Sequence, residues 1–286
     1  MINIPITKSN NISTDIEHKL EQLLDKMENY VEQGVLIAFS GGVDSAFLIW
    51  AARKAMDRKP GGKVIALTTN SASMPVQDKA DAEKITAKMK IKHIWRESRE
   101  MDNPEYVNND EMRCYHCKSE LFSIAKQETA NLGLKWIMYG YNASDVSDVR
   151  PGHQAAVEND VLHPLADIGF SKDDIRAILK RESIEIAEKA ASPCLSSRIS
   201  HGISVSSGKL ADIAAMESVL HAEGIKICRV RINKTGDELF LRIEIHPDEF
   251  QKVLNITAKL NDEGKKRGYK WITMDMAGYR TGGGTE

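Results

Sequence analysis

Six residues near the start of the chain have the composition of a phosphate-binding loop. They read Ser40-Gly-Gly-Val-Asp-Ser45 and follow the apolar run 35–39. Glycine lets a backbone approach a phosphate closely, and serine hydroxyls and the N–H groups of a following helix can donate hydrogen bonds to it. Asp44 would repel phosphate unless a divalent cation lay between them, so the loop predicts Mg²⁺. We expect the following residues to bind a nucleotide: Ser40, Gly41, Gly42, Asp44 and Ser45.

Taken alone, a Gly-Gly pair is also typical of a simple turn with a serine helix cap. The lysine of the Walker motif, Gly-x-x-x-x-Gly-Lys, is missing here, which argues against a kinase or a GTPase. The whole hexapeptide behind a buried strand resembles the PP-motif of the adenine-nucleotide α-hydrolase superfamily. That resemblance implies an enzyme that splits ATP between its α and β phosphates.

Cysteines provide the second chemical signal. Two residues separate Cys114 from Cys117, and Cys194 follows much later in a run of small residues. Thiolates are soft ligands that suit Zn²⁺ or an iron–sulfur cluster. Neighbouring cations, here Arg113, Lys118 and Arg198, favour the thiolate form.

These cysteines allow three interpretations. A structural zinc site needs a fourth ligand, such as His116 or Cys228. Thiol exchange between Cys114 and Cys117 is possible, although no thioredoxin-like context surrounds them. Alternatively, Cys114, Cys117 and Cys194 hold a [4Fe–4S] cluster and leave one iron free to carry sulfide or persulfide. Cys228 lies in an alternating strand pattern, where we expect a buried, inert thiol.

The elements that position these residues alternate between strand and helix. We expect strands over 35–39, 63–69, 92–96 and 136–140, and helices over 13–33, 46–53, 76–89, 111–132 and 173–182. This order predicts an α/β fold with a Rossmann-like parallel sheet and helices on both faces. Ligands of such sheets bind beyond the carboxyl ends of the strands, where the loops 40–45, 69–74 and 140–152 would meet.

The pattern changes near residue 203. A helix over 209–223, strands over 228–233 and 239–245, a helix over 247–267 and a strand over 271–276 predict a smaller C-terminal α+β domain. We place a nucleotide-binding domain at 1–200 and a substrate or oligomerisation domain at 201–286.

Composition restricts the class of protein. The chain has 286 residues, 42% hydrophobic, with 39 basic against 41 acidic side chains, which fits a globular protein. A nucleic-acid partner is disfavoured because such proteins usually carry a basic surplus. The sequence has no apolar run of about 18 residues and no secretory signal pattern, so we expect no membrane association and a cytoplasmic location.

Several motifs together resemble the LarE family of ATP-dependent sulfur transferases. They are Ser40–Ser45, Arg113–Phe122, Tyr139–Gly152, Ser192–Arg198, Arg229-Val-Arg231 and Trp271–Arg280, in this order. The resemblance implies adenylation of a carboxylate of a pyridinium dicarboxylate mononucleotide, loss of pyrophosphate, and sulfur attack that gives a thiocarboxylate of the nickel-pincer nucleotide pathway. Some members sacrifice the sulfur of one cysteine; three cysteines, as here, resemble the [4Fe–4S] type.

Roles follow residue by residue from the matched motifs. The resemblance implies catalytic roles for Cys194, Cys114, Cys117 and Asp44. It implies nucleotide contacts for Thr69, Asn142, Asp145 and Arg150. It implies substrate contacts for Ser197, Arg198, Glu217, Arg229, Arg231 and Glu244. Arg229 and Arg231 also alternate onto one face of their strand, where paired hydrogen bonds could hold a phosphate; the alternative is a solvated strand face.

The expected partners are a small nucleotide substrate, sulfide or another sulfur donor, and further copies of this chain in a homo-oligomer. Three other functions stay open. A tRNA thiolase shares the loop and the cluster, an amide-forming synthetase of the NAD or GMP type needs no cysteines, and a nucleotide-binding module would release no pyrophosphate.

Overall fold

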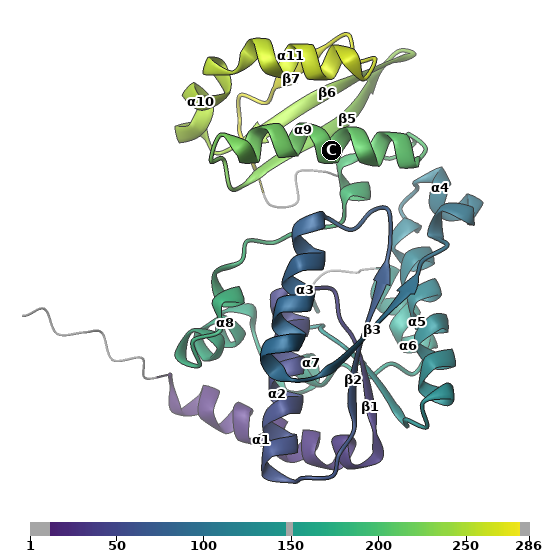
Figure 1. The fold of residues 1–286 in the computed structure, drawn as a ribbon, viewed down its shortest axis with the longest axis vertical. Coiled ribbons are helices and arrows are strands. Elements are labelled where there is room, and N and C mark those ends of the chain that lie inside the picture. The colour runs from purple at the N-terminus through teal and green to yellow at the C-terminus, as the bar shows by residue number, and fades with distance from the viewer. Residues whose placement is uncertain (1–11, 147–150, 281–286) are drawn as a thin grey trace, which may run out of the picture.

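A four-stranded parallel sheet forms the centre of the larger, N-terminal part of the molecule. The computed structural model describes residues 12–146 and 151–280. The strands β1 (Val35–Ala38), β2 (Val64–Asn70), β3 (Lys92–Glu97) and β4 (Trp136–Tyr139) pair in the order β3-β2-β1-β4. All three pairings are parallel, as the sequence predicts. The smaller C-terminal part stands above this sheet in Figure 1.

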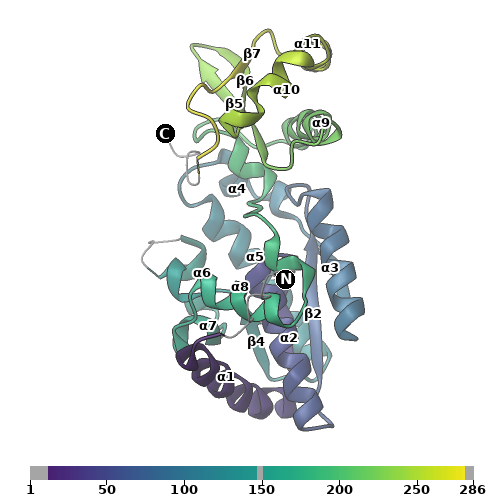
Figure 2. The same cartoon turned by 90° about the vertical axis from the view of Figure 1, so that its left-hand side faces the viewer.

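Helices cover both faces of the sheet because alternate residues of β1 point to opposite sides. Val35 and Ile37 pack into one hydrophobic core with α1 (Thr14–Gln33), α2 (Val43–Arg58), α3 (Val76–Met89), α7 (Pro164–Ile168) and α8 (Lys172–Arg181). Leu36 and Ala38 pack into another with α5 (Arg113–Asn131) and α6 (Pro151–Glu158). Figure 2 shows α3 and α6 on opposite sides of β2. The predicted Rossmann-like class is confirmed.

Helix starts follow their capping residues. Ser13 Oγ accepts a hydrogen bond from the backbone N–H of Ile16 at the start of α1, and Ser171 forms a capping box with Asp174 at the start of α8. The expected helices over 13–33, 76–89 and 173–182 therefore lie within a residue or two of the observed ones. The short helix α4 (Pro104–Asn108) was not expected from the sequence, although Asn103 caps it and Pro104 opens it.

The C-terminal part consists of a three-stranded sheet with helices packed on it. β5 (Cys228–Thr235) and β6 (Glu238–Ile245) form an antiparallel hairpin, and β7 (Ile272–Met274) pairs in parallel with β6. Three longer helices accompany them, α9 (Ser207–Ala222), α10 (Phe250–Asn255) and α11 (Thr257–Lys266). This mixed sheet with helices agrees with the expected smaller α+β unit.

The prediction of one continuous helix over 247–267 is wrong. The region 247–267 is not continuous: it opens with a 3₁₀ turn at Pro247–Glu249, and the backbone leaves the helix at Ile256, with φ −112° and ψ 19°. Asn255, Ile256 and Thr257 all have low helix propensity, two of them because their side chains branch at Cβ.

The two parts share one hydrophobic core near the expected boundary. Tyr106 of α4 is 2% exposed and packs, together with Leu195, among C-terminal residues such as Met216 and Val230. The Tyr106 hydroxyl also lies 2.6 Å from Ser196 Oγ. The division at residue 200 stays a prediction, because side chains from before that position complete the core that follows it. None of the described helices combines the length and the apolar character that crossing a bilayer requires.

Candidate active site

The backbone of the loop Ser40–Ser45 closes tightly against its neighbours. Gly41 has φ +71°, and a Cβ there would collide with the backbone carbonyl of Asp78 in α3. A Cβ at Gly140, which follows β4, would lie 2.5 Å from the amide nitrogen of Ser45. Glycine is therefore required at both positions. The amides at the start of α2 stay at the carboxyl edge of the sheet, where a phosphate can approach them.

Two hydroxyls hold this loop in shape. Ser40 Oγ accepts a hydrogen bond from the Gly42 N–H at 3.3 Å and lies 3.1 Å from Ser45 Oγ. Ser45 Oγ in turn donates to the Gly42 carbonyl at 3.2 Å. The sequence-predicted loop residues thus form one compact turn with the shape of an anion cradle.

Asp44 has the surroundings of a cation ligand. Burial raises the pKa of its carboxyl group above the ordinary value, an effect that Lys172, 3.8 Å away, opposes and that Asp145 reinforces. Among the described residues, Asp44 Oδ1 has no hydrogen-bond partner although it is buried. A buried carboxylate oxygen left open in this way fits Mg²⁺, which prefers such oxygen ligands.

Some of the other residues that the sequence analysis expects to bind a nucleotide lie around this loop. Asn142 is fully buried beside Asp44 and caps the short turn Ala143–Asp145. Asp145 is close enough to raise the pKa of Asp44. Thr69 is the second-to-last residue of β2, is half-buried, and lies near the same sheet edge. Arg150 falls outside the described residues.

The three cysteines occupy one neighbourhood, but they are not arranged as a ligand set. Burial raises the pKa of both Cys117 and Cys194, and Cys194 contributes to the rise at Cys117. Arg113 opposes the rise at Cys194, while Cys114 adds to it. Within 12–146 and 151–280, no three His, Cys, Asp or Glu side chains are grouped so that they could hold a metal ion. The thiols therefore lie near one another without forming a preformed iron–sulfur site.

Cys114 and Cys117 occupy the first turns of α5, and the exposed Cys114 contrasts with the half-buried Cys117 and Cys194. The buried carboxyl group of Glu100 accepts hydrogen bonds from the Cys117 thiol, from Ser71 Oγ and from Ser73 Oγ, the last at 2.7 Å. Ser73 lies on the loop after β2, so the cysteine helix is connected to the carboxyl edge of the sheet.

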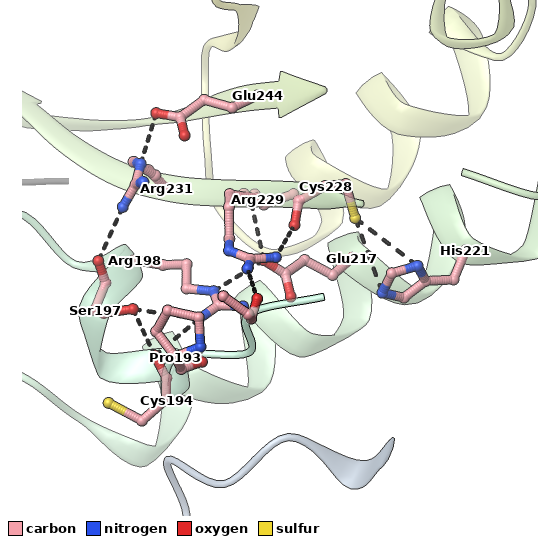
Figure 3. Close-up of polar contacts among 12 residues, drawn as sticks. Pro193, Cys194, Ser197, Arg198, Glu217, His221, Cys228, Arg229, Arg231 and Glu244 are labelled. Atoms are coloured by element: carbon pink, nitrogen blue, oxygen red, sulfur yellow. Dashed lines mark hydrogen bonds and ion pairs between the residues drawn. The ribbon is translucent and has the colours of Figure 1, made fainter. Parts of the chain in front are cut away.

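Three arginines hold the segment Ala191–Arg198, which carries Cys194. Arg198 Nη1 donates to the carbonyls of Pro193 and Cys194, the latter at 2.9 Å. Arg229 Nη2 donates to the Ala191 carbonyl at 2.6 Å, and Arg231 Nη1 to the Ser197 carbonyl at 3.0 Å. Figure 3 shows these guanidinium groups gathered over the segment, with the Cys194 sulfur pointing away from them. Arg229 and Arg231 do share one face of β5, as the alternation predicts.

Buried carboxylates balance two of these arginines. Arg198 pairs with Glu217 at 3.1 Å, and Arg231 pairs with Glu244 at 2.6 Å. Both pairs are almost completely buried. Arg229 instead lies over the Tyr279 ring, 5.2 Å from its centroid. The six residues expected to bind substrate thus make contacts within the protein, and their role toward a ligand stays a prediction.

Sequence reasoning missed several residues that assemble this region. Asn109 has a positive φ of 59° and is fully buried; its amide donates to the carbonyls of Ile199, Ser200 and Ile203. Arg113, expected only as a nearby cation, donates to the Ser196 carbonyl at 2.9 Å. Lys189 binds the phosphate loop directly through the Gly41 carbonyl, at 2.8 Å. Only Asn109 left a signal, because asparagine tolerates positive φ in turns.

Known proteins resemble the chain over nearly its full length. An uncharacterized protein of Synechocystis sp. is 32% identical over 267 residues, which cover 92% of this chain and 97% of that protein. Pyridinium-3,5-bisthiocarboxylic acid mononucleotide synthase of Lactiplantibacillus plantarum is 26% identical, covering 87% of this chain and 88% of the enzyme. An uncharacterized protein of Methanocaldococcus jannaschii is 27% identical, covering 89% and 94%. No protein-family model matches the sequence.

Proposed function

We propose that the chain, which belongs to the same family as the Synechocystis protein, is an ATP-dependent sulfur transferase of the LarE type. The proposed substrate is a pyridinium dicarboxylate mononucleotide, by analogy with the product named for the Lactiplantibacillus relative. The proposed products are a thiocarboxylate, AMP and pyrophosphate. Sulfur transfer itself is supported by the relative, and the detailed reaction is supported by the geometry below.

In the first step, a carboxylate oxygen of the substrate attacks the α-phosphorus of ATP, and the bond to pyrophosphate breaks. The loop Ser40–Ser45 would bind the departing phosphates through its hydroxyls and the amides of α2. Asp44 would hold Mg²⁺, which neutralises charge on the phosphates. The acyl-adenylate formed in this way carries a good leaving group, AMP, in place of a poor one.

In the second step, a sulfur nucleophile attacks the acyl carbon, and AMP leaves. Hydrosulfide would give the thiocarboxylate directly, with release of its proton. Attack by the Cys194 sulfur would instead give a thioester. Later loss of the Cα proton and cleavage of the bond between Cβ and sulfur would release the thiocarboxylate and leave dehydroalanine in the protein. Arg113, near Cys194, opposes the rise that burial causes in the pKa of this thiol and so favours the thiolate.

A [4Fe–4S] cluster on Cys114, Cys117 and Cys194 is the finer form of this proposal. The described thiols are neighbours but are not preformed as ligands, so no step above passes through a cluster. Iron and acid-labile sulfide, measured on anaerobically purified protein, decide this point. A colourless, iron-free protein that still transfers sulfur would exclude the cluster and leave the transferase.

A single arrangement supports the proposal most strongly: the segment with Cys194 is fastened to the carboxyl edge of the sheet that carries the phosphate loop. The Leu195 N–H donates to the Ser73 carbonyl at 2.7 Å, and the Ser192 side chain lies close to the carboxylate of Asp78, whose backbone carbonyl lies against Gly41. A thiol and an activated substrate must come within a few ångströms of each other to react. This edge is the place where that can happen.

The decisive experiment is anaerobic incubation with ATP, Mg²⁺, sulfide and the dicarboxylate mononucleotide, followed by mass spectrometry of small molecules and protein. We expect pyrophosphate, AMP and a product in which sulfur replaces oxygen. An unchanged protein mass indicates external sulfide, and a protein lighter by one H₂S indicates that Cys194 is consumed. Pyrophosphate release that survives replacement of all three cysteines by alanine, with an amide as product, would contradict the proposal.

Binding of tRNA in a gel-shift assay would favour a thiolase that acts on RNA instead. A cytoplasmic location and a homo-oligomer belong to the same proposal. Cell fractionation and light scattering of the purified protein test them.

A further inference from the structure

Lys189 lies where the phosphate loop, α3 and the Cys194 segment meet. Its ammonium group donates to the Gly41 carbonyl at 2.8 Å and pairs with Asp78 at 2.7 Å and Asp81 at 2.6 Å. The side chain is only 14% exposed. One hydrogen bond and two ion pairs therefore hold this ammonium group within the protein.

Asp78, a partner of Lys189, contacts both regions of the candidate site. Its backbone carbonyl lies against Gly41. Its carboxylate pairs with Lys189 and lies close to the Ser192 hydroxyl. Lys189 and Ser192 therefore fasten the same short stretch of chain at two points. Cys194 follows Ser192 by two residues.

The backbone of Lys189 is fixed as well. Arg176 of α8 donates to the Lys189 carbonyl at 2.6 Å and also to the carbonyl of Ala187. The neighbouring residues Ala190 to Pro193 are exposed to solvent, so few packing contacts can fix this stretch in place. Its position depends on polar contacts, which are those of Lys189 and Ser192 together with the bonds that Arg229 and Arg198 donate to the carbonyls of Ala191 and Pro193.

We propose that Lys189 is a positioning residue that sets the distance between the phosphate loop and Cys194. This inference rests on the proposed function and deepens it, because it identifies the residue that keeps Cys194 at a fixed distance from the phosphate loop. The acyl-adenylate would form at the loop, and the sulfur must meet it there. A displacement of about 1 Å between reacting groups can lower a rate by about a hundredfold.

A second lysine provides a matched control. Lys84 of α3 pairs with Glu185, so it joins α3 to the same stretch of chain that contains Lys189. Both members of this pair are largely exposed, with 63% of the Lys84 side chain and 71% of the Glu185 side chain accessible. An exposed pair of this kind contributes little to holding a segment in place.

The test measures the reactivity of Cys194 in the purified full-length protein without substrate. Wild type, Lys189→Met, Lys189→Arg and Lys84→Met are treated with iodoacetamide, and peptide mass spectrometry follows each cysteine separately. In Lys189→Met we expect Cys194 to react about tenfold faster. This factor corresponds to the loss of the charge-assisted hydrogen bond that holds the segment against the phosphate loop. Lys189→Arg keeps the charge and should restore the wild-type rate.

Two controls are built into the same experiment. The rate at the exposed Cys114 should change by less than about twofold in every variant, and Lys84→Met should leave Cys194 as in wild type. If Lys189→Met leaves Cys194 at its wild-type rate, the proposal is overturned. If that variant does not fold, as judged by its melting curve, Ser192→Ala removes the other attachment to Asp78 and must accelerate Cys194 in its place.

Turnover then tests whether the two regions are coupled. Lys189→Met should still form pyrophosphate but should yield less thiocarboxylate per pyrophosphate than Lys84→Met does. Equal yields from the two variants would contradict the proposal. The iodoacetamide assay needs neither ATP nor substrate, so its result on Lys189 does not depend on the proposed reaction. If wild-type protein forms no pyrophosphate, the proposed function is refuted, but the role of Lys189 is still decided by this assay.

Discussion

The phosphate loop is held mainly by its own residues, with one distant side chain, Lys189, bound to it, whereas the Cys194 segment is held mainly by side chains from distant parts of the chain. Within Ser40–Ser45, two serine hydroxyls bind each other and the loop backbone. The segment Ala191–Arg198 makes its principal contacts with Arg229 and Arg231 of β5, with Arg113 of α5, and with the loop after β2. One region is local in sequence, and the other is assembled by the whole fold.

This difference separates two kinds of chemical demand. A phosphate is bound by amides and hydroxyls that a short strand–turn–helix unit can supply by itself. A sulfur nucleophile must be brought to a fixed place and shielded, which needs long side chains that reach across elements. Changes in the loop should therefore act on the nucleotide, and changes among the arginines should act on folding and on Cys194.

The largest effect is expected from Asp44→Asn. Asparagine is neutral and binds Mg²⁺ poorly, so pyrophosphate formation should fall by about a thousandfold, the scale of lost charge stabilisation at a phosphoryl centre. Pyrophosphate release under saturating ATP measures this loss. A variant that kept most of its activity would exclude Asp44 from the metal site.

Arg198→Met should affect stability almost as strongly. It leaves Glu217 buried without its cation, and breaking a buried pair in this way costs about 3 kcal/mol. Urea denaturation followed by circular dichroism measures the free energy of unfolding. The double variant Arg198→Met with Glu217→Gln serves as the control, because it removes both charges and should recover part of the loss. No recovery would mean that the arginine acts through its carbonyl contacts alone.

Gly41→Ala tests the loop without touching a charge. The added Cβ meets the Asp78 carbonyl, so the loop must open and the affinity for ATP should fall by about thirtyfold, roughly 2 kcal/mol. Gly61→Ala is the matched control, since Gly61 also has a positive φ but has open space around it. Titration calorimetry should find unchanged affinity there. Equal losses in both variants would attribute the effect to backbone strain.

The pH dependence of stability gives a smaller effect. Burial raises the pKa of Asp44 in the folded protein, so folding favours its protonated form. Nucleotide-free protein should therefore gain stability as the pH falls toward the raised pKa, and lose it as the pH rises through that value. Asp44→Asn should melt on the order of 2 °C higher than wild type at neutral pH and lack this contribution. Melting curves recorded between pH 4 and pH 8, in steps of about one pH unit, would reveal the contribution of Asp44 to stability.

The smallest effect is expected at Cys228. This thiol is fully buried beside His221, and burial raises its pKa to about 12, so it stays protonated and inert. Cys228→Ala should cost about 1 kcal/mol through a small cavity and leave sulfur transfer unchanged. A loss of transfer in a well-folded variant would assign Cys228 to the reactive group of thiols.

The same comparison explains what the sequence could predict. The alternation of strands and helices is a local pattern, and the fold class predicted from it is confirmed. The glycine-rich loop is a local pattern too, and its phosphate-binding role stays a prediction. The contacts of Lys189 join residues more than 100 positions apart, and no local pattern marks them. The arginines were expected to face a ligand, because sequence shows their charge but not the buried carboxylates and carbonyls opposite them. The break at Ile256 was missed because hydrophobic spacing continues across it.

Tyr106 determines whether the C-terminal part of this molecule can be separated from the rest. Its ring fills the core beneath β5 and β6, although it belongs to the segment between β3 and α5. A gene segment encoding only the C-terminal part would lack that aromatic plug and the Leu195 beside it. The C-terminal part expressed by itself would therefore have a gap in its core, and its stability depends on residues that precede it in the chain.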